Sequence, residues 1–331
     1  MARDGARPVY DPAGHDAELR AALQEVRAGR WMSMRALLER TTVWWQWTQR
    51  TQVLAAAAAG TDVVRAWLAE EPHSVPAAVM QARVAVERAL RARRDGHRRT
   101  HELWIEAWDV SDAATRAAPR DPVPWVCLLA LAQLDRRQLW AEHRVAPPGP
   151  MLPPGPWGLL AEADKRDPYN REAHHRVLQF LYAQAASDRL AEAAGYAHSV
   201  AGSAPPGSAL HLLPLYVRVE RYRRGSGRAA ALDLYWVADD ATREAGRAYT
   251  SWFERSRPDE RSPLDLNHLA HALWGALRFE DAARVFEAIG PYYTPLPWTQ
   301  RAAAPGDQSE AVQLFLQARA RSRSAARGPG A

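Results

Sequence analysis

The sequence contains one cysteine and one lysine, and both scarcities limit its interpretation. Cys127 cannot form an intramolecular disulfide, and its place in the apolar run PWVCLLALAQL predicts a small buried side chain. Lys165 is the only lysine among 43 cationic residues, so almost every cation is an arginine. Abundant Ala, Arg, Pro and Gly with almost no Lys is typical of a GC-rich bacterial genome. This bias weakens a functional interpretation of any single arginine.

The patterns of several common protein classes are also missing. The N-terminal stretch MARDGARPVYDP lacks the apolar core of a signal peptide, and no run approaches 18 consecutive apolar residues. We therefore expect a cytoplasmic protein with no membrane-spanning helix. No P-loop, dinucleotide-binding glycine pattern or Gly-x-Ser-x-Gly turn occurs, so the sequence predicts no cofactor and names no catalytic residue.

Helical periodicity dominates the chain, and alternating β-branched runs are scarce. The periodicity predicts an all-α protein. We expect helices over 15–29, 33–41, 43–59, 61–71, 76–94, 100–118, 123–143, 171–185, 189–202, 264–291 (as a hairpin) and 309–322.

Proline ends several of these helices at similar intervals. Pro72, Pro122, Pro168 and Pro206 each follow a helical stretch, and they are about 38 to 50 residues apart. Proline cannot continue a helix interior but suits the first turn of the next helix. Helical hairpins that close on proline and recur in this way predict a stacked array of helical repeats.

The hairpins resemble tetratricopeptide repeats, whose pattern is W-x2-L-G-x2-Y, then A-x3-F, then P. In the segment 264–291, Leu269-Ala270 aligns with the L-G pair of this pattern, and Leu273 aligns with its tyrosine. Ala282 and Phe286 match the A-x3-F part. In the opening repeat, Trp44-x2-Trp47-Thr48 is similar to W-x2-L-G, and Pro72 closes the repeat. The resemblance implies helical hairpins stacked into a right-handed α-solenoid.

Composition divides this array into parts. We expect an N-terminal helical-repeat array over 1–144, a proline-rich loop over 145–156, and a C-terminal array over 157–305. A capping helix is expected over 306–318, followed by a basic disordered tail over 319–331.

The tryptophan-rich stretch VWWQWTQ (43–49) gives the first candidate for a binding residue. Trp44, Trp47, Thr51 and Leu54 follow helical spacing, so Trp44 and Trp47 are expected to pack in the core. In tetratricopeptide repeats the residue after the motif tryptophan faces the concave groove. The resemblance therefore implies that the groove is lined by Trp45, Gln49, Glu172, His175, Gln179, Asn267, His271 and Trp274.

Such a groove suits a peptide or protein, because amides and imidazoles bind backbone while aromatic rings supply apolar area. We therefore expect a non-enzymatic interaction scaffold or adaptor, and two alternatives stay open. The arginine clusters at 88–99, 221–228 and in the tail, with a net charge of +5, are compatible with a nucleic-acid-associated regulator. Glu172 and His175, one helical turn apart, are compatible with an acid/base or metal site in an enzyme. The sequence leaves the partner's identity and the oligomeric state open.

Overall fold

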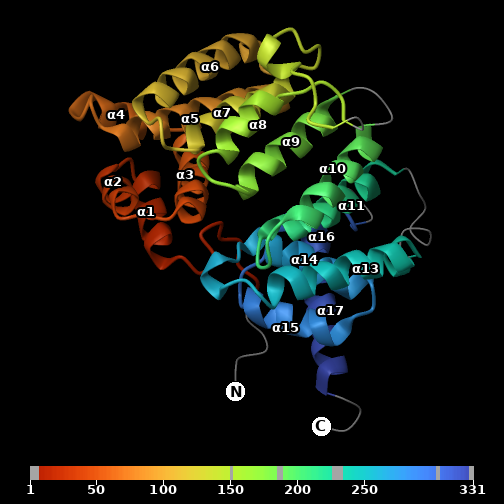
Figure 1. Cartoon of the computed structure of the whole chain (residues 1–331). Helices are drawn as coiled ribbons and strands as arrows, with labels where there is room; N and C mark the ends of the chain where they lie inside the picture. The colour runs from red at the N-terminus through yellow and green to blue at the C-terminus, as the bar shows by residue number, and fades with distance from the viewer. Residues whose placement is uncertain (1–6, 150–151, 185–188, 226–233, 303–305, 328–331) are drawn as a thin grey trace. The chain divides into compact units, whose positions relative to one another are not determined.

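The computed structural model describes residues 7–149, 152–184, 189–225, 234–302 and 306–327 (Figure 1). These residues form α-helices joined by short 3-10 helices, turns and loops. No β-strand occurs among them; only isolated bridges pair Val9 with Tyr292 and Val145 with Gly155. The expected all-α class is therefore confirmed for this part of the chain.

The chain divides into two compact units. Unit 1 comprises Met1–His15 and Ala197–Ala331, and unit 2 comprises Asp16–Tyr196. The division falls between Tyr196 and Ala197, and not in the proline-rich loop at 145–156 where we expected it. The described part of that loop belongs to unit 2, where Val145 and Gly155 exchange two backbone hydrogen bonds of 3.0 Å.

Unit 2 consists of α-helices that pack against one another. Its helices are α1 (Ala17–Arg27), α2 (Met32–Glu39), α3 (Trp44–Ala58), α4 (Val63–Glu70), α5 (Val75–Arg94), α6 (Thr100–Ala117), α7 (Val123–Leu131), η1 (Ala132–Leu134), η2 (Ala141–His143), α8 (Trp157–Asp164) and α9 (Arg171–Ala183). The following helix, α10 (Arg189–Ser203), spans the boundary between the units. The odd-numbered helices α1, α3, α5, α7 and α9 contact one another in chain order, and each even-numbered helix packs beside its neighbours.

Three of these helices begin after a residue whose side chain caps the first turn. Asp16 accepts a hydrogen bond from the amide of Leu19, Ser74 from Ala77, and Asn170 from Ala173. Each cap satisfies an amide that the first turn of a helix leaves without a partner. The caps therefore fix the starts of α1, α5 and α9.

The helix expected over 123–143 is wrong beyond Leu131. Helix α7 ends there and a single 3-10 turn follows it. The carboxylate of Asp135 then accepts the amides of Leu139 and Trp140 and contacts Nδ1 of His143, all at 3.0 Å. Because Asp135 supplies these amides with acceptors, the backbone turns instead of continuing the helix.

Unit 1 is arranged around one central helix. Its elements are η3 (Ala209–Leu212), α11 (Leu213–Arg224), α13 (Asp239–Ala248), the π-helix η4 (Tyr249–Phe253), η5 (Pro258–Glu260), α14 (Pro263–Gly275), α15 (Phe279–Ile289), α16 (Pro295–Trp298) and α17 (Gln308–Arg327). Helix α14 contacts α11, α13, α15, α16 and α17. The N-terminal segment joins this unit, because the amide of Val9 donates to Pro291 and its carbonyl accepts from Tyr293.

The C-terminal helix is longer than the capping helix expected over 306–318. Helix α17 continues to Arg327, although a disordered tail was expected from residue 319. Ser322 is fully buried, and the guanidinium of Arg321 lies 4.7 Å from the centre of the Phe279 ring. Contacts of this kind supply the packing that the basic composition alone did not predict. Residues 328–331 of the expected tail lie outside the described residues.

None of the described helices is long and apolar enough to cross a membrane.

Candidate functional site

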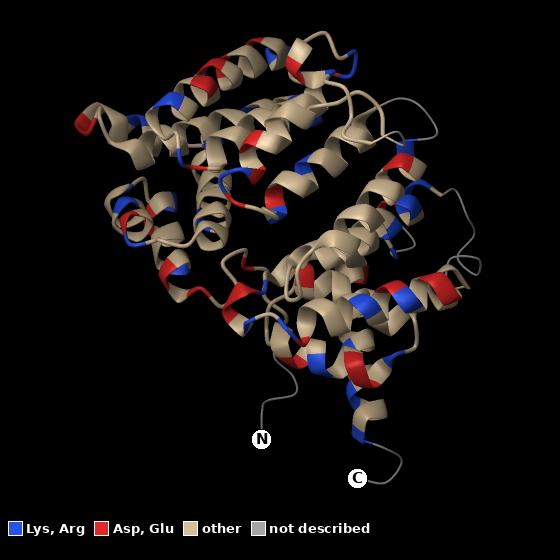
Figure 2. Ribbon diagram, viewed as in Figure 1, with Lys and Arg blue, Asp and Glu red and all other residues tan. Residues whose placement is uncertain are grey.

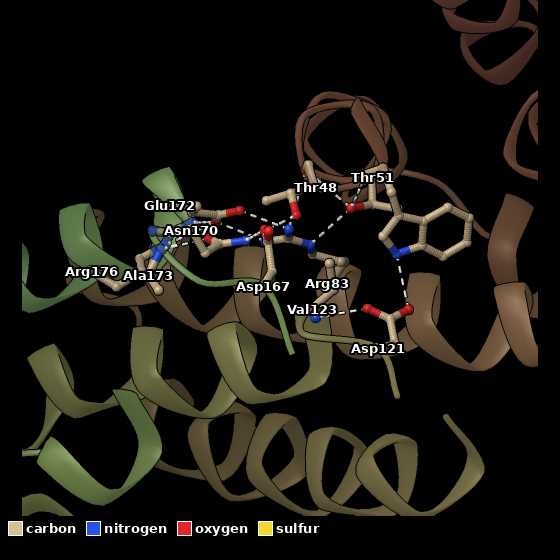
Figure 3. Close-up of polar contacts among 11 residues, drawn as sticks. Thr48, Thr51, Arg83, Asp121, Val123, Asp167, Asn170, Glu172, Ala173 and Arg176 are labelled. Carbon is tan, nitrogen blue, oxygen red and sulfur yellow. Dashed lines mark hydrogen bonds and ion pairs between the residues drawn. The ribbon is translucent and has the colours of Figure 1, made fainter. Parts of the chain in front are cut away.

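A buried network of charged side chains occupies the middle of unit 2 (Figure 3). It begins at α9, where the Asn170 cap places Glu172 in the first turn. The side chain of Glu172 is 3% exposed. An acidic residue in the first turn is favoured by the free amides and the dipole of a helix N-terminus.

Arg83 of α5 provides the countercharge for Glu172. Two guanidinium nitrogens of Arg83 lie 2.7 Å from the two carboxylate oxygens of Glu172. The same guanidinium donates to the carbonyl of Thr48 at 3.2 Å and to the hydroxyl of Thr51 at 3.3 Å, both on α3. Arg176, one turn after Glu172, donates to the same carboxylate at 2.7 Å. This network therefore fastens α3, α5 and α9 together (Figure 3).

The charges in this network set the ionisation of Glu172. Burial by itself would raise its pKa, but the guanidinium groups of Arg83 and Arg176 outweigh burial and lower the pKa to about 2. Glu172 is therefore an anion at neutral pH, and both of its oxygens contact guanidinium groups. A carboxylate held in this way is a poor proton acceptor, so the geometry does not favour Glu172 as a general base.

A second carboxylate borders the network. Asp121 accepts hydrogen bonds from the indole nitrogen of Trp47 at 2.9 Å and from the amide of Val123 at 2.7 Å. Burial raises its pKa to about 6, against the opposing effects of these bonds and of Arg83. Cys127 of α7 is fully buried nearby, and burial raises the pKa of its thiol to about 12. The thiol is therefore not activated as a nucleophile.

These contacts determine the roles of the clustered tryptophans. Trp47 is buried, as its position in the stripe predicted, and its indole nitrogen bonds to Asp121. The same stripe predicted a buried Trp44, and that prediction is wrong. Trp44 and Trp45 are half-buried, which leaves part of each ring available to solvent. The stretch therefore contributes one tryptophan to the core and two to the rim of α3.

Five of the eight predicted groove residues belong to unit 2 and come from only two helices. Trp45 and Gln49 lie on α3, and Glu172, His175 and Gln179 lie on α9. Of these, only Glu172 is buried; Gln179 is exposed and the other three are half-buried. The side-chain amide of Asn170 donates to the hydroxyl of Thr48 at 3.3 Å, which links the start of α9 to α3.

The other three predicted residues, Asn267, His271 and Trp274, lie on α14 in unit 1. Asn267 is fully buried, where it accepts from the indole nitrogen of Trp298 at 3.0 Å and donates to the carbonyl of Pro263 at 2.8 Å. His271 is 1% exposed, and only Trp274 is half-buried.

The structure therefore corrects the placement of Glu172, Asn267 and His271, which do not line an open surface. A repeat register gives a residue's side of the helix, but not what covers that side. In α14 every residue from Asp265 to Leu273 is buried, because other elements of unit 1 surround this helix. Glu172 is buried because Arg83 pairs with it.

Sequence reasoning also missed residues that define these interiors, among them Arg83, Asp121, Trp236 and Trp298. For Arg83 a signal was present. It lies four residues after Val79 and three before Val86, and both valines are buried on α5. A charged residue on the apolar stripe of a helix indicates a buried ion pair.

Several arginines of the clusters proposed for nucleic acid are engaged within the protein; residues 226–228 and 328–331 of these clusters lie outside the described residues. Arg88 donates to the carbonyls of Ala59 and Thr61, and Arg99 pairs with Glu102. Arg223 and Arg224 both pair with Glu220. Helix α13 carries both basic and acidic residues, whereas the charged residues of α6 are mostly acidic (Figure 2). Internal pairs of this kind reduce the charge available to phosphates.

Among the described residues, no group of three or more His, Cys, Asp or Glu is arranged to hold a metal ion. Comparison of the chain with protein-family models, curated proteins and solved structures finds no match.

Proposed function

We propose that this chain is a non-enzymatic interaction protein that binds a peptide or protein partner on the α3–α9 face of unit 2. We define this face by Trp45 and Gln49 of α3 with His175 and Gln179 of α9. The observation that carries the proposal is the buried network of Arg83 and Glu172. It holds two helices far apart in sequence in a fixed relation while their neighbouring aromatic and amide side chains reach the surface.

The composition of this face supports a protein or peptide ligand. Tryptophan supplies a large rigid apolar area, and glutamine amides both donate and accept hydrogen bonds with a partner's backbone. Because α3 and α9 are already fixed to α5, little conformational entropy is lost when a partner binds.

The order of helix contacts in unit 2 supports the same proposal. The contacts of α1, α3, α5, α7 and α9 in chain order are typical of stacked helical hairpins, in which one helix of each hairpin lines a common face. We propose that unit 2 is a divergent array of this tetratricopeptide-like kind. Arrays of stacked hairpins commonly use such a face to bind extended partners.

The experiment compares wild type with Trp45→Ala and with Leu139→Ala as the matched control. Leu139 is a 67% exposed apolar residue of the same unit, outside the α3–α9 face. Proteins retained from an extract of the source cells by each immobilised full-length chain are identified, and each candidate is then purified for calorimetric titration. Circular dichroism verifies the fold of each variant.

The proposal predicts a partner whose Kd rises about tenfold or more with Trp45→Ala, as for a central aromatic contact, and is unchanged with Leu139→Ala. If every purified partner binds Trp45→Ala as tightly as wild type, the α3–α9 face is not the binding surface.

A further inference from the structure

His271, at the centre of unit 1, is a buried imidazole without hydrogen-bond partners. It is 1% exposed, and neither Nδ1 nor Nε2 has a partner. The rings of Trp236 and Trp298 meet it edge to face, with centroids 4.7 Å and 5.2 Å away. Such contacts supply weak N–H···π interactions at most. A buried polar group left in this state costs about 1–3 kcal/mol, so the arrangement calls for an occupant.

Two neighbouring tryptophans share this lack of partners. The indole nitrogens of Trp236 and Trp274 are shielded from solvent and have no hydrogen-bond acceptor, and both rings contact His271. Trp298, in contrast, donates to Asn267. A neutral imidazole carries one donor and one acceptor, whereas an indole nitrogen only donates. The three side chains therefore offer three N–H donors and one acceptor, which favours an occupant rich in acceptors.

The charge around the cluster favours an anion. The guanidinium of Arg301 lies 4.6 Å from the centre of the Trp274 ring. Burial lowers the pKa of His271 well below its ordinary value, and the guanidinium of Arg301 and then His268 lower it further. The potential at His271 is therefore positive.

Gly275 brings Arg301 close to α14. A Cβ atom at this position would lie 2.9 Å from Cβ of Trp236 and 3.2 Å from Nη1 of Arg301. A larger side chain would push both groups away, so glycine allows them to approach the backbone beside His271. Trp274 and Arg301 are half-buried, so part of each of these two residues reaches solvent.

We propose that His271, Trp236, Trp274 and Arg301 form a binding site for a small organic carboxylate. The two oxygens of a carboxylate offer about four acceptor positions. The two indole N–H groups, the imidazole N–H and the guanidinium are all donors, and a carboxylate only accepts. This site belongs to unit 1 and does not depend on partner binding by unit 2.

The test titrates the full-length protein with acetate at constant ionic strength, with chloride as the balancing anion and inorganic phosphate in a parallel series. Nuclear magnetic resonance follows the indole N–H signals, which the variants Trp236→Phe and Trp274→Phe assign by their loss. Acetate is expected to shift the signals of Trp236 and Trp274 with a Kd of about 1–10 mM, a range typical of a ligand of a few atoms.

Variants then locate the site. Arg301→Gln is expected to weaken acetate binding about tenfold or more, because it removes a charge-assisted hydrogen bond. Trp274→Phe keeps the aromatic packing and removes one N–H, so a loss of about three- to tenfold is expected. Arg284→Gln, which changes an exposed arginine of the same unit, is the matched control and should leave the affinity unchanged.

Three results overturn the proposal. If neither anion shifts the Trp236 and Trp274 signals, the cluster holds water only. If Arg301→Gln leaves the acetate response intact, Arg301 is not part of the site and the proposed site is wrong. If phosphate shifts these signals and acetate does not, the ligand carries a phosphoryl group and the assignment to carboxylates is wrong.

Discussion

Glu172 is an acidic residue that unit 2 keeps ionised in its interior. Removal of a carboxylate from water is costly, and here Arg83 and Arg176 compensate with contacts of 2.7 Å. The charges are therefore interdependent. If one of these charged groups is removed, the remaining charges stay buried without a countercharge. The resulting loss of stability exceeds the stability that the intact ion pairs contribute.

The substitution Glu172→Gln is expected to lower the free energy of unfolding of unit 2 by about 3–5 kcal/mol, because Arg83 and Arg176 lose their countercharge. Urea denaturation of the variant and of wild type measures this. Glu102→Gln is the matched control, since Glu102 forms a solvent-exposed pair with Arg99 and its loss should have little effect. Equal effects of the two substitutions would show that the buried network does not stabilise the fold.

His271 gives unit 1 a dependence on pH. Its pKa in the folded state is lowered by burial and then by the charges of Arg301 and His268, so folding favours the neutral imidazole. For a base with a depressed pKa, the stabilisation is complete above the unfolded value of 6.5 and is lost as the pH falls below it. We expect the free energy of unfolding of unit 1 to fall by up to about 1.4 kcal/mol per pH unit below that value.

Hydrogen exchange of the α14 amides as a function of urea, in chloride buffers from neutral to acidic pH, measures this dependence. His271→Phe should flatten the slope, whereas substitution of the exposed His97 by Gln should leave it unchanged. A slope that persists in His271→Phe would assign the acid sensitivity to another group.

At the scale of elements, the sequence predicted helices well where the helical periodicity is long and uninterrupted. Helices were expected over 76–94 and 100–118, and α5 and α6 span Val75–Arg94 and Thr100–Ala117. Prediction failed where a long-range or side-chain contact decides the outcome. Asp135 draws the backbone out of the expected helix after α7, and Phe279 packs against Arg321 of the expected tail.

The candidate site was predictable only in part, for a related reason. Helical spacing correctly predicted that Trp47 is buried, but it also predicted a buried Trp44, which is half-buried like Trp45. The same spacing failed for Asn267 and His271, since α14 is covered on all sides. Which helix becomes central depends on the packing of distant segments, and no local pattern encodes it.

A substitution in helix α17 can show whether packing contacts keep the C-terminal segment helical despite its basic composition. Phe315 is fully buried against Phe286, Tyr293 and Trp298. Phe315→Ala is expected to destabilise unit 1 by about 3–5 kcal/mol, as for a large-to-small change in a core, with loss of the helix around it. Denaturation followed by circular dichroism measures this. The matched control is Leu277→Ala at a 56% exposed position, which should have a small effect.

At the scale of the whole molecule, each of the two units has its own interior. Unit 2 contains the Arg83–Glu172 network, and unit 1 contains the aromatic residues around α14. Separate interiors allow one unit to open without the other. Hydrogen exchange should therefore increase in unit 2 alone for Glu172→Gln and in unit 1 alone for Phe315→Ala. An equal increase in both units for either variant would show that they unfold as one.

The central claim is that unit 2 binds its partner on α3 and α9, and the most direct measurement is hydrogen–deuterium exchange of the full-length chain with and without a purified partner. Our account predicts slower exchange in peptides covering 44–58 and 171–183, with little change in α14. Protection confined to unit 1, or to the arginine-rich segment 88–99, would contradict it.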